Sequence, residues 1–488
     1  MRARTLMFQG TGSDVGKSVL VAGLCRVFTR RGLKVLPFKP QNMSNNAAVT
    51  PDGGEIGRAQ ALQAIACGVE ASVHMNPVLL KPQSDFGSQI VVLGKATGNA
   101  QGDYYRAHRE TLLATVIESF EILKQQADVV LVEGAGSPAE INLRNGDIAN
   151  MGFATATDTP VVLIGDIDRG GVIASLVGTH SLLPVEEQNL ICGFLINKFR
   201  GDVSLFEEGV TAIEQRTTWP SFGILPFVHA VRNLPAEDAV VLEQGNHTTG
   251  DGILIAVPML SRIANFDDVD PLQAEPDVTV QFIPPGQPLP GDAALVLIPG
   301  TKSTTGDMAF FRQQGWDIDI KAHHRRGGRV LGICGGYQML GNRIEDPDGI
   351  DGAPSTIDGL GLLDITTIMV PEKTVQQTEA HCPPLNCSAR GYEIHVGITT
   401  GPDVEARPFL QIEDRNLGAM SADGSVMGGY MHGLFEDDQF RASFLAPFRS
   451  GEHRQTQYGH VVDQALNQLA DAMEQHLNVE AMWQSMSS

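Results

Sequence analysis

The sequence predicts an α/β fold made of two doubly wound, mostly parallel sheets. Short apolar runs that suit buried strands alternate with helix-length segments through both halves of the chain. Glycine-rich turns, typical of a strand that passes directly into a helix, follow two of these runs. At 488 residues the chain is too long for one ordinary hydrophobic core, so we expect more than one domain.

In the first half, six runs have the length and composition of strands buried on both faces. Helix-length segments, such as residues 19–31 and 106–126, lie between them, which favours a parallel sheet covered on both sides. Ligands of such sheets bind at the carboxyl ends of the strands. The predicted strands are residues 5–8, 34–38, 128–132, 161–164, 190–196 and 222–225.

A polar, turn-rich stretch at residues 233–251 interrupts this pattern, and we interpret it as a linker. A second α/β series follows it, with strands predicted at residues 253–257, 278–283, 294–298 and 329–333 and less regular β-like runs as far as residue 430. The expected division is a first domain over residues 1–232, the linker, a second domain over 252–440 and a helical tail over 441–488.

The composition excludes several classes of protein. A formal net charge of -22 argues against a nucleic-acid partner, which requires a basic surface. The six cysteines are scattered, as expected for reduced thiols in a cytosol. The N-terminus lacks the apolar core of a signal peptide, and no apolar run approaches the ~18 residues of a membrane span. We therefore expect a cytoplasmic protein that acts on small molecules.

The first glycine-rich turn reads GTGSDVGKS and predicts a phosphate-binding loop (P-loop). Backbone N–H groups of such a loop surround phosphates, its lysine reaches the outer ones, and the following hydroxyl binds magnesium. Gly16, Lys17 and Ser18 fit these roles, although Thr11 stands where the usual spacing requires glycine. The predicted ATP contacts in this loop are Gly10, Thr11, Gly12, Asp14, Val15, Gly16, Lys17 and Ser18, with Ser18 also on magnesium.

Polar side chains follow other predicted strands. The segment DIDRGG places Asp166, Asp168 and Arg169 at a carboxyl end, where phosphoryl transfer needs them. The long polar segment 38–64 enters a helix and is either a ligand-binding loop or a disordered lid. If it binds a ligand, its lysine and amides suit a carboxylate-rich molecule, and one of its acids joins the metal site. The residues concerned are Lys39, Gln41, Asn42 and Asn45, and Asp52 or Glu55 for the metal.

The P-loop, together with VEGAGS at residues 132–137, resembles the dethiobiotin synthetase family of ATP-dependent enzymes that phosphorylate a carboxyl or carbamate group. The resemblance implies that Glu133 binds magnesium or its water, and that Asn197 and Lys198 lie near the adenine. Two alternatives stay open. Glu133 would otherwise partner a helix N-terminus, and Lys198 would otherwise lie in a solvated loop.

The second glycine-rich turn, GICGGYQ, matches the G-x-C-x-G-x-Q turn of class I glutamine amidotransferases. Such a turn exposes a nucleophilic cysteine at a helix N-terminus, which favours the thiolate. We expect Cys334 as nucleophile and His432 as its base. Leu434 stands where these enzymes carry the third catalytic residue, and Glu393 or His395 are the candidates to replace it. The predicted oxyanion hole is formed by Gly300, Thr301 and Gly335.

The two halves together resemble the cobalamin-pathway amidases, and the match is closest to the cobyric acid synthase family over residues 1 to about 445. This resemblance implies amidation of the b, d, e and g carboxylates of adenosylcobyrinic acid a,c-diamide, with ATP, magnesium and glutamine. The expected partners are then a corrinoid polycarboxylate, glutamine and ATP, with no nucleic acid and no membrane, and the oligomeric state stays open. The alternatives are a cobyrinic acid a,c-diamide synthase and, from another class, a regulatory P-loop ATPase with a degenerate amidotransferase module.

Overall fold

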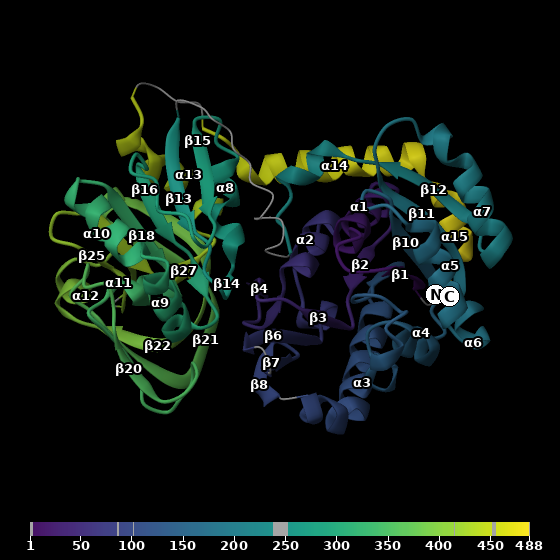
Figure 1. Ribbon diagram of the computed structural model, residues 1–488, viewed down its shortest axis with the longest axis horizontal. Coiled ribbons are helices and arrows are strands. Elements are labelled where there is room, and N and C mark those ends of the chain that lie inside the picture. Colours follow the sequence, from purple (N-terminus) through teal and green to yellow (C-terminus); the bar gives the residue numbers. More distant parts are fainter. Residues whose placement is uncertain are drawn as a thin grey trace. The chain divides into compact units, whose positions relative to one another are not determined.

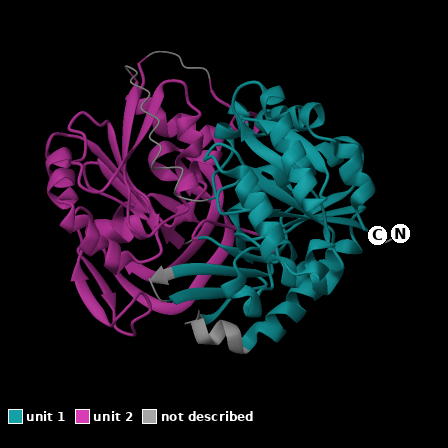
Figure 2. Ribbon diagram, turned by 45° about the vertical axis from the view of Figure 1, so that its right-hand side comes forward, with its two compact units in different colours: residues 1–44, 54–237, 462–488 teal, residues 45–53, 238–461 magenta. Residues whose placement is uncertain are grey.

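The computed structural model describes residues 3–84, 87–100, 102–237, 252–413, 415–450 and 455–487. The chain divides into two compact units, which Figure 2 shows in different colours. Unit 1 contains residues 1–44, 54–237 and 462–488, and unit 2 contains residues 45–53 and 238–461. Each unit is built around its own parallel sheet, which confirms the predicted fold class.

Unit 1 is centred on a six-stranded parallel sheet in the order β12-β11-β10-β1-β9-β2. All six strands coincide with runs predicted from their apolar residues, and most of their side chains are buried. The strands are β1 (Arg4–Gly10), β2 (Val35–Phe38), β9 (Val129–Glu133), β10 (Val161–Asp166), β11 (Ile191–Phe199) and β12 (Ser221–Pro226). Because β1 lies at the centre, the P-loop that follows it is central in unit 1.

Helices cover both faces of this sheet (Figure 1). On one face, alternate strand residues join one continuous core with α3 (Gly102–Lys124), α4 (Met151–Thr157) and α5 (Val172–Leu182). Phe38, Phe120 and Phe153 form its aromatic centre, with ring centroids 5.1–5.5 Å apart. Helix α1 (Lys17–Arg30) contacts β1, β2 and β9 from its own side.

The N-terminal half also contains strands that the sequence pattern did not reveal. Residues 38–64, expected as a polar loop that enters a helix, contain β3 (Gln41–Met43), β4 (Ala47–Val49), β5 (Glu55–Gly57) and the start of α2 (Arg58–Cys67). Strands β6 (Val78–Ser84), β7 (Gly87–Val92) and β8 (Lys95–Ala100) join β3 in a small second sheet. Its strands, such as VLLKPQS in β6 and GSQIVV in β7, join a short apolar run to polar residues and show no clear alternation.

The C-terminal residues 462–488 belong to unit 1 and not to a separate tail. Helix α15 (Val479–Ser485) follows α14 (Tyr458–His476) and brings the two chain ends together (Figure 1). The Thr5 N–H donates to the Ser487 carbonyl at 2.9 Å, and the Asn478 N–H donates to Phe222 in β12 at 2.8 Å. The apolar face of these helices packs on unit 1, so the part of the expected helical tail from residue 462 onward groups with unit 1.

Unit 2 contains a six-stranded sheet in the order β15-β13-β16-β18-β26-β25. Every neighbouring pair is parallel except β25 with β26. Four of its strands, β13 (Ile253–Pro258), β15 (Val278–Ile283), β16 (Leu295–Ile298) and β18 (Arg329–Ile333), agree with the prediction, and β26 (Val426–Gly429) and β25 (Ala419–Met420) complete it. Helices α9 (Thr304–Gln313), α10 (Trp316–Arg325) and α11 (Gly335–Leu340) pack against one another and against β18.

The β-like runs before residue 430 form a second, seven-stranded sheet in unit 2. Its long hairpin of β21 (Thr366–Cys382) and β22 (Cys387–Thr400) pairs Thr378 with Gly391 and places β22 against β27 (Met431–His432). The other members are β19 (Arg343–Asp346), β20 (Ser355–Asp358), β23 (Leu410–Ile412) and β24 (Arg415–Leu417). This sheet carries the strand beside the cysteine turn.

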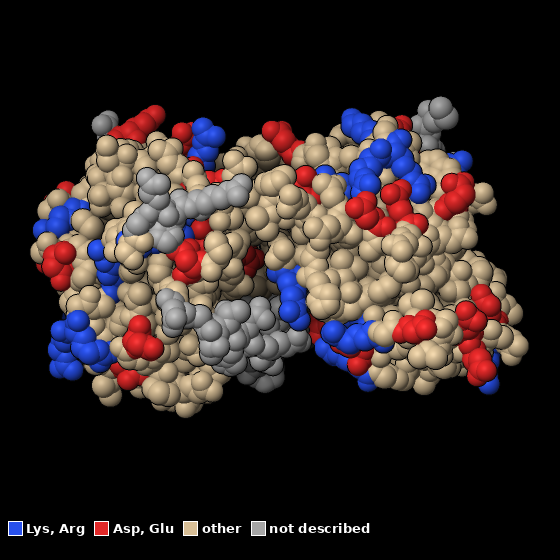
Figure 3. Space-filling view, turned by 90° about the horizontal axis from the view of Figure 1, so that it is seen from above, with Lys and Arg blue, Asp and Glu red and all other residues tan. Residues whose placement is uncertain are grey.

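Charged side chains of both signs lie near one another over the surface that Figure 3 presents. In unit 1, for example, Arg26 pairs with Asp463 at 2.7 Å and Arg30 pairs with Asp471 at 2.6 Å, which links α1 to α14. Some of the acidic side chains are therefore paired with basic ones at the surface.

Among the helices of the described residues, none is long and apolar enough to cross a membrane.

Candidate nucleotide and thiol sites

The P-loop runs from the end of β1 to the start of α1. Gly16 precedes the helix with φ +93°, a conformation that favours glycine, and a Cβ there would lie 2.5 Å from the amide nitrogen of Asn197. The Lys17 ammonium donates to the carbonyls of Gly12 and Gly136, both at 3.1 Å. Burial and then the nearby Lys39 ammonium lower the pKa of Lys17. Lys17 therefore lies over the loop and faces the turn after β9.

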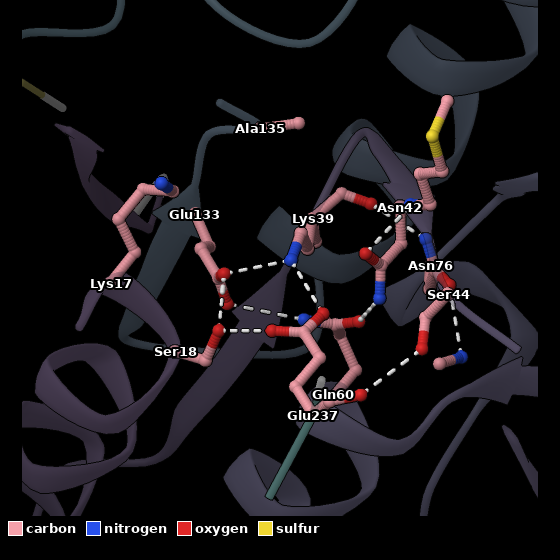
Figure 4. A network of polar contacts seen from close by, with 12 residues as sticks. Lys17, Ser18, Lys39, Asn42, Ser44, Gln60, Asn76, Glu133, Ala135 and Glu237 are labelled. Carbon is pink, nitrogen blue, oxygen red and sulfur yellow. Dashed lines mark hydrogen bonds and ion pairs between the residues drawn. The ribbon is translucent and has the colours of Figure 1, made fainter. Parts of the chain in front are cut away.

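A buried group of charges lies beside Lys17 (Figure 4). The Ser18 hydroxyl lies 2.7 Å from Glu133 Oε1 and 2.5 Å from Glu237 Oε2. The Lys39 ammonium donates to the same two carboxylates, at 2.8 and 2.9 Å. Burial lowers the pKa of Lys39, but Glu133 and Glu237 outweigh it and raise that pKa. One serine and one lysine thus bridge two carboxylates.

Two glutamines of α2 fix the Glu133 carboxylate, which is fully buried. Gln60 and Gln63 donate from their amide nitrogens to Glu133 Oε2, at 3.2 and 2.6 Å. Gln63 also donates to the Ser18 carbonyl at 3.2 Å. In the described part of the chain, the buried Gln63 Oε1 has no hydrogen-bond partner. Such an acceptor is costly unless a bound molecule supplies a donor.

These oxygens fit a magnesium ion. Magnesium prefers hard oxygen ligands, keeps several waters and usually takes one or two carboxylates together with substrate phosphates. Ser18 and Glu133 supply a hydroxyl and a carboxylate at the P-loop, and Gln63 Oε1 is a free acceptor for a metal-bound water. Within the described residues, no group of three or more His, Cys, Asp and Glu forms a metal site by itself. That is expected where phosphates complete the shell.

The turns after β10 and β11 also face the P-loop. The Lys198 ammonium donates to Asp166 Oδ2 at 2.8 Å and to the Asp14 carbonyl. The Arg169 guanidinium donates to the Asp14 carboxylate at 3.3 Å. Asp168, in contrast, accepts from Arg200 at 2.6 Å at the surface, and this contact lowers its pKa. Asp166, Lys198 and Arg169 thus lie at the loop, whereas Asp168 is engaged elsewhere.

An apolar cavity opens beside Gly16, Asn197 and Lys198. The Asn197 amide donates to the Val15 carbonyl at 2.8 Å and so attaches β11 to the P-loop. The cavity has the size and lining of a site for a flat base rather than for phosphate. Its remaining lining residues are Val19, Leu20, Leu225, Pro226, Phe227, Val228, Val231 and Leu469.

The structure separates some residues of the polar segment 38–64. Lys39 and Asn42 belong to the charged group, where the Asn42 amide donates to Gln60 at 3.2 Å. Glu55 instead pairs with Lys81, away from the P-loop. Asn45 and Asp52 belong to unit 2, where Asp52 accepts from the Thr50 hydroxyl. Neither Asp52 nor Glu55 contacts Ser18 or Glu133, so these two acids lie outside the charged group at the P-loop.

In unit 2, Cys334 occupies the turn between β18 and α11. Its φ of 52° and ψ of -111° are strained for a residue with a side chain, as in a sharp strand-to-helix turn that presents a nucleophile. The Cys334 N–H donates to the Gly429 carbonyl at 2.8 Å, and its thiol lies 3.5 Å from the Ile394 carbonyl in β22. The cysteine is 8% exposed.

Neighbouring strands bring the predicted oxyanion donors to this turn. β16 lies next to β18 and leads to β17 (Gly300–Thr301). A Cβ placed on Gly335 would lie 3.2 Å from the Thr301 backbone nitrogen, and one on Gly300 would lie 3.1 Å from His432 Cε1. Gly300, Thr301 and Gly335 therefore surround the same small space beside Cys334 and His432. We retain them as proposed oxyanion donors.

His432 has the acidic partner that the sequence did not identify. β26, on the other side of β18, leads to His432 in β27. Its Nδ1 lies 2.7 Å from Asp268 Oδ2, and the Gly433 N–H donates to Asp268 Oδ1 at 2.7 Å. Burial lowers the pKa of His432, but Asp268 and the Cys334 hydrogen bond outweigh it and raise the pKa to about 10.

Glu393 and His395, the residues expected to replace a missing acid, form a separate network. The buried Glu393 accepts from Arg415 at 2.7 Å, Gln376 at 2.8 Å and His395 at 3.2 Å. Burial raises the pKa of Glu393, but these donors outweigh it and lower the pKa. The His395 ring stacks on Tyr430 with centroids 3.8 Å apart. The acid that contacts His432 Nδ1 is Asp268. Neither Glu393 nor His395 makes this contact.

Two functional candidates were therefore missed from the sequence. Asp268 lies in a short 3₁₀ turn (Phe266–Val269) some distance after β13. The one signal in the sequence is its position beyond the carboxyl end of a buried strand, where functional residues of such sheets lie. Glu237 fell within the stretch interpreted as a linker, whose residues 238–251 lie outside the described part of the chain. Both acids reach their sites through tertiary structure and lack a local motif.

Comparison with known proteins identifies the relatives of both units. Residues 6–241 match the CobQ/CobB/MinD/ParA nucleotide binding domain, and residues 254–440 match the CobB/CobQ-like glutamine amidotransferase domain. The chain is 61% identical to the cobyric acid synthase of Brucella suis biovar 1 over 485 residues, and 60% identical to that of Brucella canis, in each case over 99% of both chains. Among solved structures, the MinD cell division protein of Aquifex aeolicus resembles the chain weakly, with a TM-score of 0.28 and 13% sequence identity. The match covers 47% of this chain and 84% of the MinD chain.

Proposed function

This chain belongs to the cobyric acid synthase family of ATP-dependent amide-forming ligases, and we propose that it amidates the b, d, e and g carboxylates of adenosylcobyrinic acid a,c-diamide. Glutamine would supply the nitrogen and ATP the energy. The single observation that carries this proposal is that one chain holds both a P-loop with a lysine-bridged carboxylate pair and a Cys334–His432–Asp268 arrangement.

Unit 1 would activate the carboxylate, which is inert toward ammonia. Lys17 and the backbone N–H groups of the P-loop would bind the outer phosphates, and the apolar cavity beside Asn197 would bind the adenine. Lys39 is placed to attract the anionic substrate and the transferred phosphoryl group. Magnesium, held by Ser18 and Glu133, would offset negative charge on the phosphates. The product of this step would be an acyl phosphate.

Unit 2 would release ammonia from glutamine. Asp268 would orient His432 and stabilise its protonated form, and the Cys334 sulfur beside it would act as the nucleophile. The thiolate would attack the glutamine amide carbon, and the Gly335 and Thr301 N–H groups would stabilise the oxyanion. His432 would donate its proton to the departing ammonia. Water would then hydrolyse the thioester to glutamate.

The experiment supplies purified protein with ATP, magnesium, ¹⁵N-amide glutamine and a panel of corrinoid acids, and follows the products by mass spectrometry. We expect four ¹⁵N atoms to enter the a,c-diamide. Incorporation of two into cobyrinic acid itself would indicate the a,c-diamide synthase activity instead. Absence of both glutaminase activity and nitrogen transfer would favour the regulatory ATPase and contradict the proposal.

A further inference from the structure

Glu237 lies in the nucleotide site although it belongs to no recognised motif. Its carboxylate is 2.5 Å from the Ser18 hydroxyl and 2.9 Å from the Lys39 ammonium, and only 15% of its side chain is exposed. The Ser44 hydroxyl donates to its backbone carbonyl at 3.3 Å, which fixes the segment that carries it. Glu237 is therefore a built part of this site, on the opposite side of Ser18 and Lys39 from Glu133.

The contacts of Ser18 point to a cation at this position. The hydroxyl has one proton, yet its oxygen lies within 2.7 Å of Glu133 Oε1 and 2.5 Å of Glu237 Oε2. One of these two short oxygen–oxygen contacts therefore lacks a proton between its atoms. Two anionic oxygens so close to one hydroxyl oxygen repel one another unless positive charge lies among them. Lys39 supplies one positive charge, which its ammonium shares between Glu133 Oε1 and Glu237 Oε1, so the two carboxylates keep a surplus negative charge at Ser18.

We propose that Glu237 is a direct ligand of the magnesium ion, together with Ser18 and Glu133. Ligands on neighbouring corners of a magnesium octahedron, each ~2.0–2.1 Å from the metal, lie about 2.9 Å apart. The separations of 2.7 and 2.5 Å around Ser18 open to that value with a small movement of the side chains. Gln63 Oε1, which is buried and without a hydrogen-bond partner among the described residues, would accept from a water bound to such a metal.

The assignment also resolves a conflict of charge. A carboxylate beside the P-loop repels the phosphates of ATP, and Glu237 lies on the hydroxyl that is expected to bind the metal. As a metal ligand it attracts the MgATP complex instead. Two carboxylates, rather than one, then make the site select nucleotide that already carries the metal. This inference rests on the proposed use of MgATP by unit 1.

The test measures metal binding directly. Wild-type protein is saturated with the non-hydrolysable β,γ-imido analogue of ATP and titrated with Mn²⁺, and free Mn²⁺ is quantified by electron paramagnetic resonance. We expect Glu237→Gln, which keeps the size and removes the charge, to weaken Mn²⁺ binding at least ~10-fold. Glu237→Asp keeps the charge but shortens the side chain, so its Mn²⁺ affinity should lie between those of wild type and Glu237→Gln. Glu208→Gln makes the same charge change at an exposed position of unit 1 and should match wild type.

The outcomes separate the two claims. Equal Mn²⁺ affinity in Glu237→Gln and wild type, with the same thermal unfolding, overturns the role of Glu237. Tighter binding of the nucleotide to Glu237→Gln also overturns it, because the carboxylate would then be a competitor of the phosphates. If wild type itself binds no metal with the nucleotide, the proposed function of unit 1 fails. If Glu237→Gln does not fold, the comparison of Glu237→Asp with wild type decides.

Discussion

His432 is a buried imidazole whose charge is set by its neighbours. Burial alone favours the neutral ring, but the Asp268 carboxylate and the Cys334 hydrogen bond reverse that preference and raise the pKa to about 10. A raised pKa means that the protonated form is stabilised by folding. Relative to the ordinary value of 6.5, this contribution to stability is complete below pH 6.5 and is lost as the pH rises through about 10.

Asp268→Asn should therefore lower the pKa of His432 and loosen the orientation of its imidazole at the thiol site. We expect kcat/KM of the glutaminase reaction to fall at least ~10-fold and its alkaline limb to move to lower pH. The pH profile is measured with glutamine alone. Asp292→Asn, an equivalent change at the surface of unit 2, serves as the control. An unchanged profile in a folded Asp268→Asn variant would remove Asp268 from the thiol site.

Cys334→Ala should abolish glutamine-dependent amidation yet preserve amidation driven by ammonium salt, because the phosphorylating unit does not use the thiol. Amide formation is assayed with each nitrogen donor in turn. Cys192→Ala, which removes a half-buried thiol of unit 1, should retain both activities. Loss of the ammonium-dependent reaction in folded Cys334→Ala would show that the cysteine has a second role.

Lys17→Ala should lower turnover with both nitrogen donors by at least ~10²-fold, roughly 2.7 kcal/mol of barrier. The ammonium reaches the Gly12 carbonyl of the P-loop at 3.1 Å and would neutralise phosphate charge that develops in the transition state. Initial rates of ADP formation test this. Lys34→Ala, at an exposed position just before β2, should behave as wild type. A surviving rate in Lys17→Ala would contradict the phosphate role.

At the scale of elements, helix α15 stabilises unit 1 through its contacts with β12 and the N-terminus. Met482 is completely buried, and Arg4 lies over the Trp483 ring at 4.4 Å. Met482→Ala should reduce the free energy of unfolding of unit 1 by about 2–4 kcal/mol. In urea, ATP hydrolysis should then be lost at lower concentration than glutaminase activity. Gln484→Ala, exposed on the same helix, should leave both midpoints unchanged.

The strands that could be predicted share one property. Residues 129–132 and 161–164, for example, are apolar on both faces because helices cover both sides of the sheet. Strands β3 to β8 mix apolar and polar residues without such a continuous run. Turn motifs located Ser18 and Cys334, since phosphates and nucleophiles demand a local backbone shape. Asp268 needs only to reach His432 in space, so no spacing in the chain reveals it.

Across the whole molecule, the order of residues along the chain differs from their grouping in space. Residues 45–53 belong to unit 2 and residues 462–488 to unit 1, so each unit is completed by a segment distant in sequence. The sequence predicts a helical tail over residues 441–488 but does not say which core its apolar face covers. Only the folded structure assigns the last part of this tail to unit 1.

The overall reaction makes one prediction that neither unit satisfies alone. If a carboxylate is phosphorylated before ammonia attacks, each amide formed should consume one ATP to give ADP and phosphate. Oxygen-18 in the substrate carboxylates should then appear in the released phosphate, because the carboxylate oxygen is the atom that accepts the phosphoryl group. Phosphate is isolated after a single round and its isotope content is measured by mass spectrometry, with ammonium replacing glutamine as a control for unit 2. Label in AMP would instead mean that the carboxylate attacks the α-phosphate, and the acyl phosphate route assigned to Lys17 and Lys39 would be wrong.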